Sequence, residues 1–136
     1  MLDNKFQEMK DDILGKRYSL SIGTVSEKKS KEINKKYRKK NKPANVLSFP
    51  FSKSSGEIIL CPSTIRKDTK KFDKNFEELL QFMVIHGMLH LKGMQHSSTM
   101  ERAEEKYDKK YLNRNRNRIR QNESGGRRNN QRRKIS

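Results

Sequence analysis

The sequence is poor in several residue types that mark particular protein classes. It contains no tryptophan, one cysteine and three prolines, and aromatic residues make up 7% of the chain. The single cysteine, Cys61, excludes an internal disulfide bond and a metal cluster built from cysteines. No run approaches the ~20 apolar residues of a membrane span, and the polar start of the chain lacks the apolar segment of a signal peptide. Secreted disulfide scaffolds and membrane proteins are therefore excluded, and we expect a cytoplasmic protein.

Acidic and apolar residues are scarce as well. The 136 residues include 16 Asp and Glu against 33 Lys and Arg, which gives a formal net charge of +17. Hydrophobic residues make up 30%, below the roughly 45–50% of an ordinary globular domain. This length and composition predict one small folded domain together with a part that does not fold.

The basic residues are concentrated in two segments. Range 113–136 carries eight Arg and one Lys against one acid, Glu123, and has no aromatic residue. It cannot bury enough apolar surface to offset its loss of conformational entropy, so we expect a folded domain at 1–112 and a disordered Arg-rich tail at 113–136. Range 28–42 carries nine Lys and Arg against Glu32. Two such segments favour a nucleic-acid partner; a solvated surface and an anionic membrane surface are the alternatives.

Three segments have the pattern of β-strands. Range 17–26 alternates apolar with smaller or polar residues, whereas 45–51 and 56–61 are short apolar runs of strand-forming residues. The last two are separated by a connection of hairpin length. Pro50 restricts its strand to the edge of a sheet.

A first helix is predicted over 27–38. Ser26 is suited to cap its N-terminus, and Pro43 closes the segment that follows it. Its few apolar residues, Ile33 and Tyr37, predict one narrow buried stripe.

The most informative helix begins after Asn75, which is placed to form a capping box with Glu78, and continues with apolar residues on nearly every face. Such a helix is buried at the centre of its domain, and Gly93 is suited to end it in a left-handed conformation. A charged amphipathic helix at 99–112 follows, with four residues toward the core: Met100, Ala103, Tyr107 and Tyr111. Strands and helices mix without regular alternation, so the predicted fold class is α+β, with a small mixed sheet packed on the buried central helix.

All three histidines of the chain lie close together in this region. His86 and His90 are four residues apart, so both imidazoles project from one face of the central helix. Gly93 lets the chain turn sharply enough to bring His96 back toward them. Three nitrogen ligands on one side of a metal leave a fourth position open, as in a catalytic zinc site. We therefore predict one zinc ion per chain, bound by these three histidines.

Hydrogen-bonded core histidines without a metal are the alternative. Each imidazole would then need its own polar partner within an otherwise apolar helix, which is costly. Neutral imidazole also suits copper, iron and nickel, so the identity of the metal stays open. No spacing argues for Cys61 as a fourth ligand, and the role of a small buried hydrophobic residue fits it better.

The spacing of the histidines equals that of the H-E-x-x-H-x-x-G-x-x-H metalloproteases. Those enzymes use the Glu of this motif as general base, and the present chain has Gly87 at that position. Peptide hydrolysis by the usual route would lack its proton acceptor. A metalloprotease is therefore a minor alternative.

The stretch HGMLHLKGMQH at 86–96 resembles the H-G-x-L-H-L-x-G-[YF]-D-H signature of the YbeY-type bacterial endoribonucleases, also called rRNA maturation factors. Two further stretches agree with that family. Range 37–50 is similar to its Y-R-x-x-x-x-P-T-[ND]-V-L-S-F-P motif, and 56–61 is similar to its G-D-I-x-I strand. The resemblance covers about 31–107, with order and spacing kept.

The resemblance implies a single-domain α+β metalloprotein that cleaves single-stranded RNA in maturation of the 3′ end of small-subunit ribosomal RNA and in ribosome quality control. It implies His86, His90 and His96 as metal ligands and Arg38, in the matching Y-R context, as the functionally important arginine. The implied partners are ribosomal RNA, the small ribosomal subunit and assembly factors, with neither membrane nor DNA expected. In the mechanism we expect, the metal acts as a Lewis acid or activates water, and Arg38 holds the scissile phosphate.

Four features depart from the family pattern. Gln95 stands where Asp usually precedes the last histidine, and an amide cannot carry its negative charge. Glu57 replaces an Asp, Ala44 replaces a Thr, and the Arg-rich tail is not a usual family feature. Gln95 and the tail keep a second hypothesis open, a non-catalytic RNA-binding ribosome-assembly protein with a structural metal.

Overall fold

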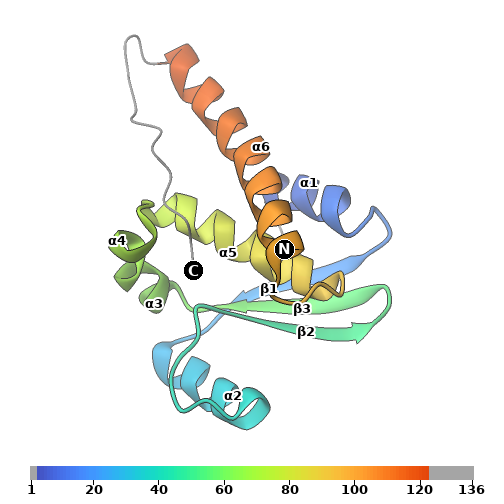
Figure 1. Ribbon diagram of the computed structural model, residues 1–136, viewed down its shortest axis with the longest axis vertical. Coiled ribbons are helices and arrows are strands. Elements are labelled where there is room, and N and C mark those ends of the chain that lie inside the picture. The colour runs from blue at the N-terminus through green and yellow to red at the C-terminus, as the bar shows by residue number, and fades with distance from the viewer. Residues whose placement is uncertain (1–2, 123–136) are drawn as a thin grey trace.

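A computed structural model describes residues 3–122, with side chains described as far as Leu112. Figure 1 shows a small sheet with helices packed around it. The elements in chain order are α1 (Asn4–Ile13), β1 (Ser19–Thr24), α2 (Glu27–Arg38), β2 (Val46–Ser52), β3 (Ser55–Leu60), α3 (Pro62–Lys67), α4 (Thr69–Phe72), α5 (Phe76–Leu91) and α6 (Ser98–Asn122).

The sheet is three-stranded and mixed, in the order β1-β3-β2. β1 runs parallel to β3, and β2 pairs antiparallel with β3 as a hairpin. The position of Pro50 on the edge strand β2 agrees with its lack of a backbone donor. The register shifts between Pro50 and Ser52, so Phe51 has no partner on β3. These findings confirm the predicted α+β class with a small mixed sheet.

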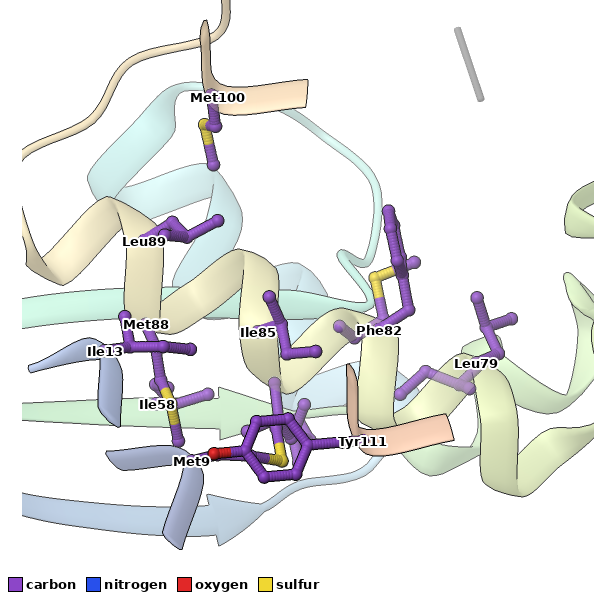
Figure 2. Close-up of a cluster of buried hydrophobic side chains, with 14 residues drawn as sticks. Met9, Ile13, Ile58, Leu79, Phe82, Ile85, Met88, Leu89, Met100 and Tyr111 are labelled. Atoms are coloured by element: carbon purple, nitrogen blue, oxygen red, sulfur yellow. The ribbon is translucent and has the colours of Figure 1, made fainter. Parts of the chain in front are cut away.

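Helix α5 forms the centre of the fold, as its apolar sequence predicted. The capping box of Asn75 and Glu78 begins it, and Gly93 just beyond its end has φ +105°. Figure 2 shows α5 side chains, among them Ile85 and Met88, packed against β3 and against side chains from α1 and α6. α5 therefore lies between the sheet and two helices, while α2 covers the opposite face of the sheet (Figure 1).

The buried side of α2 differs from the prediction. Ser26 caps the helix as expected, by accepting a hydrogen bond from the amide of Lys29. The buried residues, however, are Ser30 and Asn34, whereas Tyr37 is exposed. The Ser30 hydroxyl donates to the carbonyl of Ala44, and the Asn34 amide donates to that of Lys42, both at 2.8 Å. The polar contacts to the following loop, and not an apolar stripe, fix this helix.

Helix α6 continues beyond Leu112, the residue at which the sequence placed its end, and reaches Asn122. Extending an existing helix needs no new nucleation, and Arg has a good helix propensity. The predicted boundary between a folded domain and a disordered tail at 113–136 therefore does not coincide with a helix end. Range 123–136 of the predicted tail lies outside the described residues. Within 3–122, no helix has the length and apolar character that crossing a membrane requires.

Candidate metal centre

The three histidines converge at the C-terminal end of α5. His86 and His90 lie in the last turns of the helix, and the turn at Gly93 returns the chain so that His96 faces them. One nitrogen from each ring can be chosen so that all three lie within 4.8 Å of one another. The ring centroids of His86 and His90 are 4.5 Å apart, and those of His90 and His96 are 4.8 Å apart. The convergence expected from the spacing is therefore present in the fold.

The Nε2 atoms of His86 and His90 face each other at 3.1 Å. Two nitrogens bound to one tetrahedral zinc ion at about 2.0–2.1 Å would be about 3.3 Å apart. The pair is thus spaced for one shared ion, and the imidazole donors fit zinc and the other metals that histidine binds. His96 is exposed, so the cluster opens toward solvent on one side.

The Nδ1 atoms of the same two rings have partners on the far side from Nε2. His86 Nδ1 is hydrogen-bonded to the carboxylate of Glu104, and His90 Nδ1 donates to the carbonyl of Met94 at 3.0 Å. A proton held on Nδ1 leaves the Nε2 lone pair free to bind a metal, and such outer partners orient metal-binding histidines in many proteins. With both Nδ1 atoms engaged, the two Nε2 atoms face each other and could share a metal ion.

Burial near the end of α5 also favours the neutral form of His90. Loss of solvent is the main cause that lowers the pKa of His90, and the neighbouring His86 lowers it further. The carbonyl of Met94 acts in the opposite sense but does not outweigh them. The ring is therefore poised to offer a lone pair at neutral pH.

Glu104 was not identified from the sequence. It comes from α6 and is 8% exposed. Asp108, one turn further along, accepts hydrogen bonds from Gln81 of α5 and from Lys74, both at 3.1 Å. These contacts fix α6 against α5. The signal in the sequence is that Glu104 and Asp108 fall on the same helical stripe as the core residues Met100 and Tyr111, where a solvated acid is not expected.

Gly87 lies beside the first histidine and faces the sheet. A Cβ at this position would be 3.0 Å from Ile58 and 3.1 Å from the hydroxyl of Ser48. Ser48 on β2 also donates a hydrogen bond to the carbonyl of Gly87 at 3.1 Å. The glycine therefore allows α5 to approach the sheet closely. The position at which metalloproteases carry a general base points into packed protein here and has no room for a carboxylate.

The other candidate residues lie outside the histidine cluster. Arg38 is the exposed last residue of α2, the helix that lies on the face of the sheet opposite α5 (Figure 1). Its neighbour Tyr37 packs edge-on against Phe49 of β2, with ring centroids 5.3 Å apart. Cys61 is buried at the start of α3 and does not belong to the group of residues that can share a metal. Gln95 is exposed in the turn before His96.

A cluster of three imidazoles, two of them oriented by hydrogen bonds to Nδ1 and the third exposed to solvent, defines a candidate metal site on a small α+β domain. Comparison with known proteins gives the family. The family model described as Endoribonuclease YbeY matches residues 2–116. The chain therefore belongs to the YbeY endoribonuclease family.

Individual relatives agree with this assignment. The chain is 39% identical over 116 residues to Endoribonuclease YbeY of Buchnera aphidicola, covering 74% of this chain and 75% of that protein. It is 34% identical over 112 residues to Endoribonuclease YbeY of Thermotoga neapolitana, covering 82% and 74%. A solution structure of a Thermotoga maritima protein matches with a TM-score of 0.61 at 29% identity, covering 90% of this chain and 89% of that one.

Proposed function

We propose that this protein is a metal-dependent endoribonuclease that cuts single-stranded RNA. The observation that carries the proposal is the convergence of the three histidines, with two Nε2 atoms 3.1 Å apart and aimed at one point. The names of the family model and of the relatives supply the substrate class. Zinc, one ion per chain, is the metal that three imidazoles with an open fourth position favour.

His86, His90 and His96 would hold the ion, with Glu104 and the Met94 carbonyl orienting two of the rings. A zinc ion so bound supplies Lewis acidity toward a phosphoryl oxygen and lowers the pKa of bound water. The carboxylate of Glu104 is engaged with His86 and is not directed to solvent. The remaining protein contribution is to bind and orient the RNA.

Arg38 is the residue we assign to the scissile phosphate. The guanidinium can bind two phosphate oxygens at once and stabilise the charge that develops during cleavage. The support for this role is its exposed position and its place in the Y-R context that resembles the family pattern. Lysines that follow Arg38 would hold flanking phosphates: Lys39, Lys40 and Lys42.

The biological setting we propose is maturation of the 3′ end of small-subunit ribosomal RNA and ribosome quality control in the cytoplasm. Ribosomal RNA, the small subunit and its assembly factors would be the partners. The family resemblance supports this setting, and the net charge of +17 suits a polyanionic partner. The two-part division into a catalytic domain at 1–112 and a basic tail at 113–136 belongs to the same proposal.

The test is cleavage of a single-stranded ribosomal RNA fragment by the full chain, with and without a chelator. We expect cleavage that the chelator abolishes and added zinc restores, and we expect His90→Ala to lose both metal and cleavage. Persistent cleavage by a His90→Ala protein shown to be free of metal would overturn the proposal.

A non-catalytic RNA-binding assembly protein is the second candidate. The observation in its favour is Gln95, an exposed amide beside His96 where the family pattern has a carboxylate. Metal-loaded protein that binds RNA in a salt-sensitive way but never cuts it would decide for this function.

A further inference from the structure

Two large hydrophobic side chains are conspicuously exposed among the described residues. Tyr37 at the end of α2 is 59% exposed, and Phe51 on β2 is 68% exposed. The other aromatic side chains of this part of the chain are buried or partly buried. Neither Tyr37 nor Phe51 belongs to the hydrophobic core, so packing does not account for them.

The two exposed aromatic side chains have different surroundings in the fold. Tyr37 rests edge-on against Phe49, which is partly buried on β2. Phe51 follows two residues further along the same strand, at the register shift where it has no partner on β3. An extra residue of this kind re-aims its side chain away from the regular strand pattern. We call Tyr37, Phe49 and Phe51 the aromatic patch.

Tyr37 and Phe49 lie on the face of the sheet opposite α5, because successive side chains of a strand point to opposite faces and Ser48 faces α5. Ser48, which immediately precedes Phe49, is bonded to the carbonyl of Gly87. Gly56, the partner of Pro50 on β3, lies against Leu91, the last residue of α5. β2 therefore runs alongside the last turns of α5, the turns that carry His86 and His90, while the ring of Phe49 faces the other side of the sheet.

Positive charge surrounds the aromatic patch. The ammonium group of Lys36 lies 5.3 Å from the centre of the Tyr37 ring. Arg38, Lys39 and Lys40 continue the chain from Tyr37, and Lys53 follows Phe51 in the hairpin; all four are exposed. The one acid paired with the patch is Glu57, opposite Phe49 on β3 and partly buried. Exposed aromatic rings interleaved with cations match the two parts of a single-stranded nucleic acid, its flat bases and its phosphates.

We propose that the aromatic patch is a base-stacking site for single-stranded RNA; this rests on the endoribonuclease function proposed above. Every base has a face that can stack, so the site reads no sequence. Bases in a duplex are already stacked on their neighbours, so the site discriminates against double-stranded RNA. The patch supplies single-strand selectivity, and the surrounding cations supply affinity without selectivity.

A peptide strand that pairs with the exposed edge of β2 is the alternative partner of this surface. The charge around Tyr37 and Phe51 favours a polyanion, so we commit to RNA. An abasic oligomer with the same ribose-phosphate backbone separates stacking from charge, because it retains every phosphate and lacks every base.

The first test is equilibrium binding of a short oligouridylate and of the abasic oligomer to the full chain in the presence of chelator, so that no cleavage is involved. We expect the wild type to bind the oligouridylate about tenfold more tightly than the abasic oligomer. Phe51→Leu, which keeps an apolar side chain, should lose most of this preference, and Phe51→Trp should keep it. Equal affinity of wild type for the two oligomers, or an unchanged preference in Phe51→Leu, would overturn the proposal.

The second test uses fluorescence, because the chain has no tryptophan of its own. Phe51→Trp places a single reporter in the patch, and Gln7→Trp places one on α1, across the sheet from α2 (Figure 1). Oligouridylate should quench the first reporter and leave the second nearly unchanged. Equal responses of the two reporters would contradict stacking at the patch. Both tests succeed or fail without catalysis, so loss of the cleavage activity and loss of the stacking site are distinguished.

Discussion

The carboxylate of Glu104 is hydrogen-bonded to Nδ1 of His86, although the two residues belong to different helices. The contact joins α6 to the face of α5 that carries the histidines and favours a proton on Nδ1 of His86. It explains why a charged side chain lies on the buried stripe of α6, at 8% exposure. We therefore expect that removing the charge of Glu104 weakens metal binding without unfolding the protein.

We predict that Glu104→Gln lowers zinc affinity about 10- to 100-fold, because the His86 ring loses its anionic partner and becomes a weaker ligand. The measurement is competition of the protein with a chromophoric zinc chelator. Glu105→Gln is the matched control, since the neighbouring carboxylate is exposed. Equal zinc affinity of the two variants would show that the contact does not position His86.

We predict that Gly87→Ala destabilises the protein by about 1 kcal/mol, even though alanine is the better helix former. The added methyl would lie 3.0 Å from the fully buried Ile58 and 3.1 Å from the Ser48 hydroxyl. The free energy of unfolding in urea measures the effect. Gly23→Ala serves as control because a Cβ there meets nothing within 4 Å. A Gly87→Ala protein as stable as the Gly23→Ala protein would refute the close approach of α5 to the sheet.

Asp12 connects α1 to α6 and gives the fold a pH dependence. It accepts hydrogen bonds from Lys110 at 2.6 Å and from Tyr111 at 3.0 Å. Partial burial alone would raise the pKa of Asp12, but these two partners outweigh it, and the pKa lies below the ordinary 3.8. A lowered pKa contributes stability that is present above about pH 4 and is lost as the pH falls through the folded-state value.

We therefore predict that Asp12→Asn costs about 1 kcal/mol at pH 7, and that its difference from wild type shrinks as the pH falls below about 4. Urea unfolding at several pH values measures this difference. Glu105→Gln again provides the comparison. A difference between Asp12→Asn and wild type that stays constant down to pH 2 would exclude the carboxylate as its cause.

We predict that Arg38→Ala lowers RNA turnover about 100-fold while the zinc content stays the same, because we assign the guanidinium to the phosphate and not to the metal. Arg38→Lys keeps the charge but cannot bind two phosphate oxygens in the bidentate geometry of a guanidinium. This variant should therefore retain RNA affinity and still cleave slowly. Single-turnover cleavage and metal analysis of the same preparations separate these effects. Unchanged turnover in Arg38→Ala would remove the assignment.

Local sequence signals predicted most of the elements that position the site. The capping pair Asn75 and Glu78, the apolar length of α5 and the turn at Gly93 depend on neighbouring residues, and all were predicted correctly. The hairpin of β2 and β3 was also predicted, because two short apolar runs are separated by a connection of hairpin length. The convergence of the histidines followed from helical spacing and one sharp turn.

The features that the sequence did not predict depend mainly on contacts between segments that are distant along the chain. Glu104 meets His86 only because α6 packs across α5, and a pattern read along one helix does not contain that pairing. Ile33 and Tyr37 looked like a buried stripe, but the loop after α2 offered polar partners to Ser30 and Asn34 instead. The short helices α3 and α4 and the N-terminal α1 lack strong periodicity and were not predicted.

The central claim is that three imidazoles share one metal ion, and X-ray absorption at the zinc edge tests it most directly. The full chain loaded with one equivalent of zinc should show three imidazole nitrogens at about 2.0–2.1 Å and no sulfur neighbour, with one nitrogen fewer in His96→Ala. Fewer than three imidazoles in the wild type, or a sulfur ligand from Cys61, would contradict the account.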